Sequence, residues 1–357
     1  MDMTPRINNL ILGNKERPSV PDPSVSAGYA RGLIDLAVSK GVDRAALLDR
    51  AGIDPVLLDD ANSRVPFEAY VRLMRAAKTL SGDEALALHY GEAANLSQFS
   101  IVGLIGHAAP TMREAFEPFN RFVRLVVDAD IGDAAGRFSL VRLGGGLWIV
   151  DNRRHPNTFP ELTESAFAQT VCATRRFGDT PFVLEVHVSH ADPGYRTEYE
   201  RVLGAPVRFA AKRNAMRIDP AWQDAKVAAL PRYMDAVLNT HAEALLKELE
   251  SSQTVRGRAE TAITPMLSAG GASVDAVSAK LGVSRQTLYR QLKVEGVTFE
   301  QVLDALRHKL ALRYIGDDKI SVNETTYLLG FSDPAAFSRA FKRWTGLSPR
   351  AMRAART

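Results

Sequence analysis

Residues 273–293 read SVDAVSAKLGVSRQTLYRQLK, and residues 321–342 repeat the pattern as SVNETTYLLGFSDPAAFSRAFK. The two copies align through Gly282 and Gly330, which lie 48 residues apart. Before each glycine, apolar residues recur at helical spacing, and the serine at the start can accept backbone N–H groups of a first turn. Each copy therefore predicts a helix, a tight turn and a second helix.

The turn has its own residue signals in each copy. Gly282 and Gly330 stand where the chain leaves the first helix, a position that favours the positive φ available to glycine. The second helix can start at a capping residue, which is Ser284 in the first copy and Ser332 or Asp333 in the second. We therefore expect two helix-turn-helix motifs, at residues 273–294 and 321–345.

The second helix of each copy has an apolar side and a basic outer side. Leu288 and Leu292 form the predicted buried side in one copy, and Phe337 and Phe341 in the other. A helix-turn-helix of this kind is typical of proteins that insert the second helix into the major groove of double-stranded DNA. The side chains expected to contact bases are Arg285, Gln286, Tyr289 and Arg290 in the first copy, and Ala335, Ser338 and Arg339 in the second. Lys293, Lys342 and Arg343 are expected to contact phosphates.

The expected base contacts differ in chemistry between the copies. Arg290 can bind guanine with two hydrogen bonds, and Gln286 suits adenine. Ala335 offers only an apolar contact, as with a thymine methyl group. We therefore expect the second copy to discriminate less between base pairs than the first.

The segment between the copies predicts one amphipathic helix over residues 299–315. Apolar and aromatic residues recur there at intervals of three and four, as Phe299, Val302, Leu303, Leu306, Leu310 and Tyr314. A helix of this length spans about 25 Å at about 1.5 Å per residue. It can hold two recognition helices at a spacing near the roughly 34 Å of one DNA turn, so that one chain contacts two successive major-groove segments.

The last hundred residues resemble the AraC/XylS family of bacterial transcription regulators. The residues that carry the resemblance are Gly330-Phe331, Phe337, Arg339, Phe341-Lys342-Arg343, Gly346 and Ser348-Pro349, with Arg307 and Ala311 in the connecting helix. Ser278 and Thr326 replace a usual alanine, and Met352 replaces a usual aromatic residue. A hydroxyl is tolerated inside a helix when it donates to a carbonyl one turn earlier.

Charge is distributed unevenly along the 357 residues. Residues 254–357 contain 16 Lys and Arg against 9 Asp and Glu, a net charge of +7, whereas the remainder of the chain has a net charge of −3. A basic module joined to a neutral or acidic domain is typical of a DNA-binding protein with a separate regulatory domain.

Composition excludes several other classes of protein. The single cysteine, Cys172, excludes an intrachain disulfide and a cysteine-rich zinc site, and it is expected to be a buried small residue. No apolar run approaches the eighteen residues or more of a membrane helix, and the polar N-terminus lacks a signal-peptide core. We therefore expect a cytoplasmic protein with no membrane contact.

The first two-thirds of the chain predict an α+β domain, mostly helical with a small sheet, followed by an all-α C-terminal domain with two helix-turn-helix motifs joined by a long helix. Helices are expected at 25–40, 44–51, 66–80, 83–91, 103–109, 111–127, 159–177, 198–203, 227–250 and 254–267. Strands are expected at 136–143, 147–152, 182–189, 206–209 and 215–218. The expected organisation is a disordered lead-in (1–24), an effector-sensing and dimerisation domain (25–250), a linker (251–253) and a DNA-binding domain (254–357).

Residues with enzymatic or metal-binding chemistry do not form a recognisable site in the sequence. The glycines at 144–146 lack the Lys-Ser/Thr of a phosphate-binding loop. His187 and His190 are three apart on a predicted strand, so they point to opposite faces. We expect no catalytic residues, no metal and no cofactor. The pairs Arg153-Arg154 and Arg175-Arg176 are expected at the solvated surface, although one of them could hold the carboxylate of an effector.

The N-terminal region also resembles the arabinose-binding-type sensing domain of one AraC subgroup. The matching segments are Ser63-Arg64-Val65-Pro66, residues 103–110, Thr111-Met-Arg-Glu-Ala115 and residues 195–209. The resemblance implies effector binding or dimerisation by this domain. The long helix at 227–250 closes the domain and could also contribute to a dimer contact.

The main interpretation is a ligand-responsive transcription regulator that binds promoter DNA as a homodimer. RNA polymerase is a candidate partner, which would make the protein an activator, and the choice between activation and repression stays open. Two alternatives remain open: a ligand-independent regulator whose first domain only dimerises, and an enzyme domain fused to a DNA-binding module.

Overall fold

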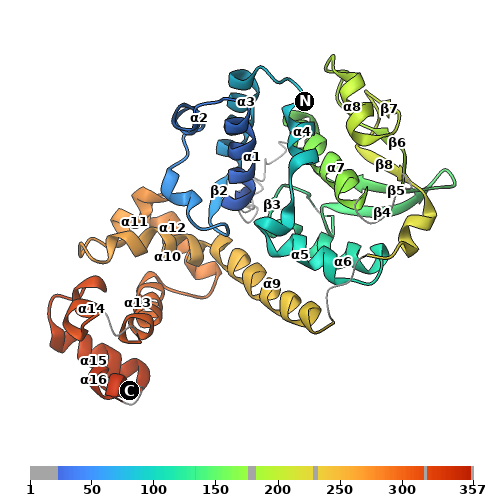
Figure 1. The fold of residues 1–357 in the computed structure, drawn as a ribbon. Helices are drawn as coiled ribbons and strands as arrows, with labels where there is room; N and C mark the ends of the chain where they lie inside the picture. Colours follow the sequence, from blue (N-terminus) through green and yellow to red (C-terminus); the bar gives the residue numbers. More distant parts are fainter. Residues whose placement is uncertain (1–22, 133, 176–181, 228–231, 317–319, 355–357) are drawn as a thin grey trace, which may run out of the picture.

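Two units follow one another along the chain, and a long helix joins them (Figure 1). The computed structural model describes residues 23–132, 134–175, 182–227, 232–316 and 320–354. The first unit is helical with two small sheets, and the second is helical only. This arrangement confirms the predicted fold class. No helix within the described ranges is both long enough and apolar enough to cross a lipid bilayer.

The first sheet has three very short strands that are far apart in the sequence. Strand β1 (Ser24–Ser26) lies between β2 (Arg64–Pro66) and β3 (Val127–Asp128), and both pairings are antiparallel. The sequence predicted a helix from Val25 onward and placed Ser24 in a disordered lead-in, and both predictions are wrong. Helix α1 (Ala27–Ser39) starts only after Ser26, whose hydroxyl accepts the Tyr29 N–H at 3.2 Å. Residues 1–22 lie outside the described part of the chain.

Arg64 crosslinks this sheet. Its guanidinium donates to the Leu125 carbonyl at 2.6 Å and to the Ser24 carbonyl at 2.9 Å, and Nε donates to the Ser24 hydroxyl at 3.1 Å. Burial lowers the pKa of Arg64 to about 10, so the group remains charged at neutral pH. Arg64 of β2 is therefore hydrogen-bonded both to β1 and to the turn that precedes β3.

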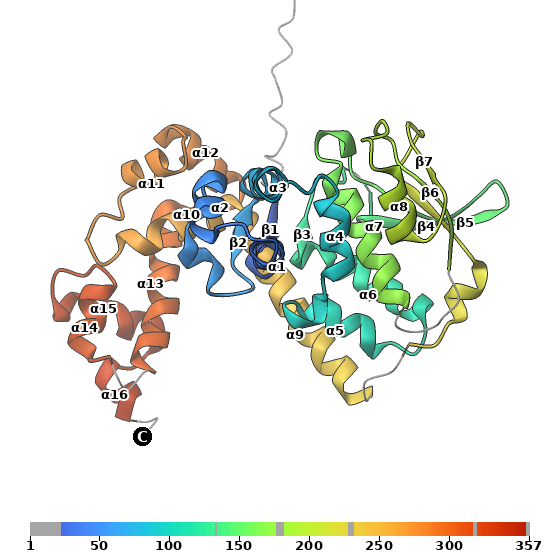
Figure 2. The same ribbon diagram turned by 45° about the horizontal axis from the view of Figure 1, so that its top comes forward.

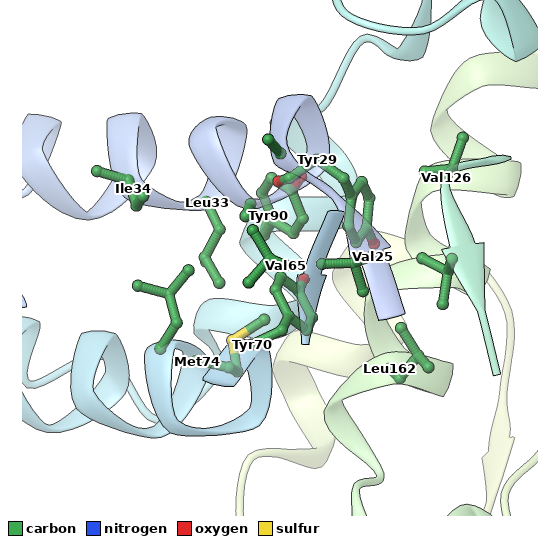
Figure 3. Close-up of a cluster of buried hydrophobic side chains, with 14 of the residues drawn as sticks. Val25, Tyr29, Leu33, Ile34, Val65, Tyr70, Met74, Tyr90, Val126 and Leu162 are labelled. Carbon is green, nitrogen blue, oxygen red and sulfur yellow. The ribbon is translucent and has the colours of Figure 1, made fainter. Parts of the chain in front are cut away.

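Four helices pack beside this sheet around a cluster of buried aromatic and aliphatic side chains. They are α1, α2 (Arg44–Ala51), α3 (Phe67–Ser81) and α4 (Leu86–Ala93). Tyr29, Tyr70 and Tyr90 meet in the cluster, and Leu33 and Met74 pack near them (Figure 3). The Tyr90 hydroxyl donates to the Tyr29 carbonyl at 2.6 Å, which satisfies a polar group inside an apolar region.

The second sheet has five strands in the order β4-β5-β8-β6-β7. The strands are β4 (Phe138–Leu143), β5 (Gly146–Asp151), β6 (Val183–His187), β7 (Val207–Arg208) and β8 (Ala215–Ile218). All neighbours are antiparallel except β6 and β7, which are parallel. The predicted hairpin is confirmed, since Leu143 pairs with Gly146 and the turn glycines Gly144 and Gly145 have positive φ.

Four further helices belong to the part of the first unit that contains the second sheet. They are α5 (Ile101–Ala108), α6 (Met112–Phe122), α7 (Glu161–Thr174) and α8 (Arg196–Leu203). Residues 123–125 form a 3-10 turn before β3, so the helix predicted to run to Val127 ends five residues early. Cys172 is half-buried and packs against the second cluster, rather than being fully buried as predicted.

Arg153 was predicted to lie at the surface, and this prediction is wrong. Its side chain is buried, with Nε 3.1 Å from the Asp151 carboxylate and Nη1 donating to the Phe159 carbonyl at 3.2 Å. Because these partners saturate it in the interior, Arg153 cannot hold an effector carboxylate. Arg176 lies outside the described residues.

The two histidines form separate contacts. His187 Nε2 lies 2.7 Å from a Glu185 oxygen, and His190 Nε2 lies 2.9 Å from the Tyr199 hydroxyl.

Helix α9 (Arg232–Gln253) connects the units. Leu238, Ala242, Leu246 and Leu249 belong to the buried cluster of the first unit. Residues 251–253, predicted as a linker, are the last turn of this helix. Thr254 then caps α10 (Val255–Ile263), its hydroxyl accepting the Gly257 N–H at 2.9 Å. The connection between the units is therefore helix against helix.

The second unit contains both predicted motifs. They consist of α11 (Val274–Lys280) with α12 (Arg285–Val294), and α14 (Val322–Leu328) with α15 (Pro334–Thr345). Helix α13 (Phe299–Ile315) joins them, and α16 (Pro349–Ala354) follows. In both ribbon views α13 lies between the two motifs (Figures 1 and 2).

The equivalent turn glycines give a test of this packing. Gly282 and Gly330 have φ of +68° and +71°, but a Cβ on Gly282 would meet nothing within 4 Å, whereas on Gly330 it would lie well inside 3.0 Å of the Leu267 carbonyl. Gly282→Ala should therefore cost about 1–2 kcal/mol from backbone strain alone. Gly330→Ala should cost more, because the Leu267 segment must also move. Urea unfolding combined with hydrogen exchange over residues 273–345 measures both, and equal losses would contradict the close approach.

Candidate nucleic-acid interface

Side-chain caps define the first motif. The Ser273 hydroxyl accepts the Ala276 N–H at 3.2 Å at the start of α11, and the Ser284 hydroxyl accepts the Thr287 N–H at 3.1 Å at the start of α12. Each cap satisfies a backbone donor that the first helical turn leaves open. Helix α12 consequently begins at Arg285, as predicted, which places the expected base-contacting residues in its first two turns.

The second motif is built in the same way. Ser321 caps α14 through the Glu324 N–H at 3.0 Å, and Asp333, rather than Ser332, caps α15 through the Ala336 N–H at 2.8 Å. The hydroxyls that replace alanine also behave as expected. Ser278 donates to the Val274 carbonyl at 2.6 Å, and Thr326 to the carbonyl one turn before it at 3.1 Å.

The predicted buried sides of α12 and α15 are confirmed. Leu288, Leu292, Phe337 and Phe341 are each 0% exposed. The two leucines share a cluster with residues of the first half of α13, and the two phenylalanines share a cluster with residues of its second half. Leu310 packs against both clusters. Helices α12 and α15 therefore belong to two apolar clusters that meet along α13.

Most of the predicted DNA-contacting residues lie on the exposed sides. Tyr289 and Ser338 are half-buried, and the others are exposed: Arg285, Gln286, Arg290, Lys293, Ala335, Arg339, Lys342 and Arg343. Neither α12 nor α15 contains an aspartate or glutamate, and each contains three basic residues. The charged side chains that each helix contributes are thus all basic, which is favourable for DNA binding.

Arg285 interacts within its own motif. Its guanidinium lies 5.6 Å from the centre of the Tyr289 ring and 3.7 Å from the Asp275 carboxylate. A hydrogen bond with Tyr289, and then the charge of Asp275, raises the pKa of Arg285. Two of the predicted base-contacting side chains therefore touch each other.

Arg343 is tied to the connecting helix. It forms an ion pair of 2.7 Å with Asp304 of α13, and the other oxygen of Asp304 accepts the Trp344 indole N–H at 2.9 Å. His308, also in α13, stacks on Trp344 with a centroid distance of 5.4 Å. Asp304 and Trp344 therefore position α15. Neither residue was predicted from the sequence, because the two are 40 residues apart and their pairing follows only from packing.

Arg307 supports the turn of the second motif. Its Nε donates to the Leu329 carbonyl at 2.9 Å and its Nη2 to the Gly330 carbonyl at 3.1 Å. The same guanidinium lies 4.7 Å from the centre of the Phe331 ring. Burial lowers the pKa of Arg307. The position singled out by the family resemblance is therefore a structural support for the turn.

Glu295 connects the first motif to the start of α10, the helix that follows α9. Its two carboxylate oxygens accept the N–H groups of Val255 and Arg256 at 2.7 and 2.9 Å. A carboxylate at a helix N-terminus satisfies open donors and interacts favourably with the helix dipole. The end of α12 is thereby fixed to the start of α10, directly after α9. No local pattern marks this contact, which joins residues 39 and 40 positions apart.

Comparisons with known proteins agree with this arrangement. Residues 41–227 match the family model described as the arabinose-binding domain of AraC transcription regulators, N-terminal, and residues 277–355 match a helix-turn-helix domain model. The first match alone covers more than half of the chain.

Similar proteins are named as transcription regulators. The ornithine utilization regulator of Pseudomonas aeruginosa is 27% identical over 337 residues, covering 91% of this chain and 95% of that protein. The regulator VirS of Mycobacterium tuberculosis is 23% identical over 327 residues, covering 90% and 94%. Among solved structures, the regulator CdpR from Pseudomonas aeruginosa aligns over 92% of this chain and 98% of its own, with 21% identity and a TM-score of 0.41. Because the arabinose-binding domain model matches more than half of the chain and a helix-turn-helix model matches its C-terminal part, the chain belongs to the AraC family of DNA-binding transcription regulators.

Proposed function

We propose that α12 and α15 enter two successive major-groove segments of one duplex. The observation that supports the proposal is that the apolar sides of α12 and α15 belong to clusters that contain opposite halves of α13, while their outer sides carry only basic and neutral side chains. In the first helix, base contacts are assigned to Arg285, Gln286, Tyr289 and Arg290, and in the second to Ala335, Ser338 and Arg339. Phosphate contacts are assigned to Lys293, Lys342 and Arg343.

A selection from random duplexes tests this proposal with the full chain. Enriched sites should contain two conserved boxes about one helical turn apart, roughly 10 base pairs, and the box read by α12 should be the more strongly conserved. Arg290→Ala and Arg339→Ala should each relax a different box. Enrichment of a single box, or no enrichment at moderate salt, would contradict the two-helix proposal.

The proposal also assigns sensing to residues up to 253 and DNA binding to residues 254–357. An effector can act on DNA binding only if the two domains are mechanically connected. Support comes from the end of α9, where Arg124 lies 3.2 Å from Glu250 and Gln253 donates to Asp128 of β3. Glu295 then holds α12 to the start of α10. A series of contacts therefore connects the first domain to the first motif through α9 and the start of α10.

The turn between α9 and α10 is also tightly packed. A Cβ on Gly257 would lie well inside 3.0 Å of the Ser251 carbonyl, so the two helices cannot accommodate a larger residue there without moving. A displacement of α9 would consequently be passed to α10. That mechanical link favours an effector-responsive regulator over one whose first domain only dimerises.

Arg290→Ala should weaken binding to the selected operator by about 1–3 kcal/mol and relax the preference at one base pair. The reason is the loss of a bidentate contact to guanine. Affinities for operators with single base-pair changes, measured by fluorescence anisotropy, test it. Arg208→Ala, which removes an exposed arginine from the first domain, is the matched control. An equal loss on every sequence would make Arg290 a phosphate contact.

Lys293→Ala should weaken binding almost uniformly across sequences and flatten its salt dependence. Losing one phosphate contact should reduce the slope of log K against log salt by about one. Titrations at several salt concentrations measure the slope. Lys247→Ala removes the same charge from exposed α9 and should leave the slope unchanged. An unaltered slope for Lys293→Ala would rule out the phosphate contact.

We further propose a homodimer, with α9 contributing to the contact. Met234 and Val237 on this helix are 38% and 44% exposed, and exposed apolar side chains on one helix favour association. Sedimentation of the full chain should show a dimer that Val237→Glu weakens, whereas Lys247→Glu should not. A monomer at concentrations that saturate the operator would contradict this. Activation through RNA polymerase is included in the proposal and is measured by transcription in vitro.

A further inference from the structure

A cavity of about 140 Å³ lies inside the first domain, where the two apolar clusters of that domain meet. Helices α5, α6 and α7, strands β4 and β5, and the turn that carries Trp222 surround it. Its walls include Phe116, Phe119, Phe138 and Ile149. A cavity of about 150 Å³ with apolar walls holds a benzene-sized molecule in other proteins. The space therefore suits a ligand built on one ring or a short branched chain.

The lining residues carry almost no charge. Among those that the structure describes at this wall there is no Asp, Glu, Lys or Arg, and His107 is the ionisable one. Its Nδ1 lies 2.7 Å from the Gly103 carbonyl of the same helix. Burying a carboxylate or an ammonium group without an opposite charge is strongly unfavourable. Amino acids and organic acids are therefore disfavoured in this cavity.

Two buried donors on the wall lack acceptors. Gln169 and Trp222 both line the cavity, and within the described residues their buried donors, Gln169 Nε2 and Trp222 Nε1, have no hydrogen-bond partner. Trp222 is 7% exposed and is held between Phe182 and Phe116, with ring centroids at 5.7 and 6.5 Å. An unsatisfied buried donor destabilises the protein, and an acceptor atom on a ligand would remove that penalty.

We propose that this cavity binds a small, neutral, mainly apolar molecule with an acceptor oxygen, such as an aryl ketone, ester or lactone. The inference rests on the proposed effector-responsive function and names the effector's chemical class. The apolar part fills the space between the phenylalanines, and the oxygen accepts hydrogen bonds from Gln169 and Trp222.

The position of the cavity connects it to the interdomain helix. Helices α5 and α6, which form part of its wall, both pack against α9. Arg121 of α6 also forms an ion pair of 2.8 Å with Glu243 of α9. A ligand that moves α5 or α6 therefore acts on the helix that continues into the DNA-binding domain.

Calorimetric titration of the full chain with three probes tests the ligand chemistry. Acetophenone has a ring and a carbonyl, cumene has a similar size with a methyl group in place of the oxygen, and benzoate carries a charge. Acetophenone should bind saturably, cumene about tenfold more weakly because it lacks the acceptor, and benzoate not at all at pH 7.5. Benzoate binding as tight as that of acetophenone, or equal binding of cumene and acetophenone, would overturn the proposed chemistry.

Gly106 offers a direct test of the location. It lines the cavity, and a Cβ on it would meet nothing within 4 Å, so Gly106→Leu should fill the space without disturbing the fold. This variant should lose acetophenone binding. Gly271→Leu is the matched control, because it adds the same side chain at an exposed glycine of the second unit. Unchanged binding by Gly106→Leu would place the probe elsewhere and overturn the assignment.

Gln169→Met and Trp222→Phe test the donors. Gln169→Met should weaken acetophenone about five- to tenfold and leave cumene unchanged, because it removes the amide donor and keeps a side chain of similar length. Trp222→Phe removes ring volume as well as the N–H, so it should weaken acetophenone more than it weakens cumene. If Trp222→Phe does not fold, Gln169→Met decides the outcome alone. An equal loss for both probes would show that the side chain only shapes the wall, and would contradict its role as a donor.

Measuring operator binding by the same ligand-free preparations distinguishes failure of the cavity inference from failure of the proposed DNA-binding function. A chain that binds its selected operator but none of the probes overturns the cavity inference and leaves the DNA-binding proposal standing. A chain that binds acetophenone as described but no operator supports the cavity and contradicts the proposed function. Acetophenone binding that leaves operator affinity unchanged in the wild-type chain overturns its role as an effector class.

Discussion

Burial of both halves of helix α13 is the interaction on which the DNA-binding unit depends. Phe299 and Leu306 pack with the first motif, Ala311 and Ile315 pack with the second, and Leu310 contacts both clusters. Each buried leucine or phenylalanine contributes about 1.5–3 kcal/mol, whereas an exposed ion pair such as Arg343–Asp304 contributes about 0–1 kcal/mol. Apolar burial therefore sets the spacing of the two recognition helices, and the polar contacts of Asp304 and Arg307 set the orientation of the second.

Apolar burial combined with polar contacts also joins the DNA-binding unit to the first domain. Helix α9 is anchored by apolar residues in the first cluster, and its end is fixed by Arg124 and Asp128. Glu295 caps α10 with both carboxylate oxygens, which ties the first motif to this junction. The second motif has no equivalent cap among these contacts and depends on α13 and the close approach of Leu267 to Gly330. The first motif is thus mechanically nearer to the first domain than the second.

Some buried polar groups of the first domain have hydrogen-bond partners, and others do not. Arg64 and Arg153 are buried with several partners each, and they join segments of the sheets and loops. In contrast, Gln169 and Trp222 line a cavity, and among the described residues no acceptor meets their side-chain donors. A satisfied buried group stabilises a fold, whereas an unsatisfied one lowers stability until something binds. This difference separates the structural arginines from the residues assigned to a ligand.

Local sequence patterns determined most of the C-terminal unit. The caps Ser273, Ser284 and Ser321, the turn glycines and the apolar spacing all act within a few residues, so both motifs and α13 were predicted nearly to their ends. The residues expected to contact DNA were identified by helical periodicity, and their exposure agrees with the prediction except for the half-buried Tyr289 and Ser338. Their individual roles at DNA remain predictions.

Contacts between distant segments were decided only by the tertiary structure. The strand at Val25 pairs with Val65 and Val127, and three residues are too few to show an alternating pattern, so this sheet was missed. Arg153 looked like a surface residue until Asp151 and Phe159 were seen around it. The cavity and its two donors arise where α5, α7 and the Trp222 turn converge. Periodicity reports which face of an element is apolar, but the partner of that face is set by packing across the chain.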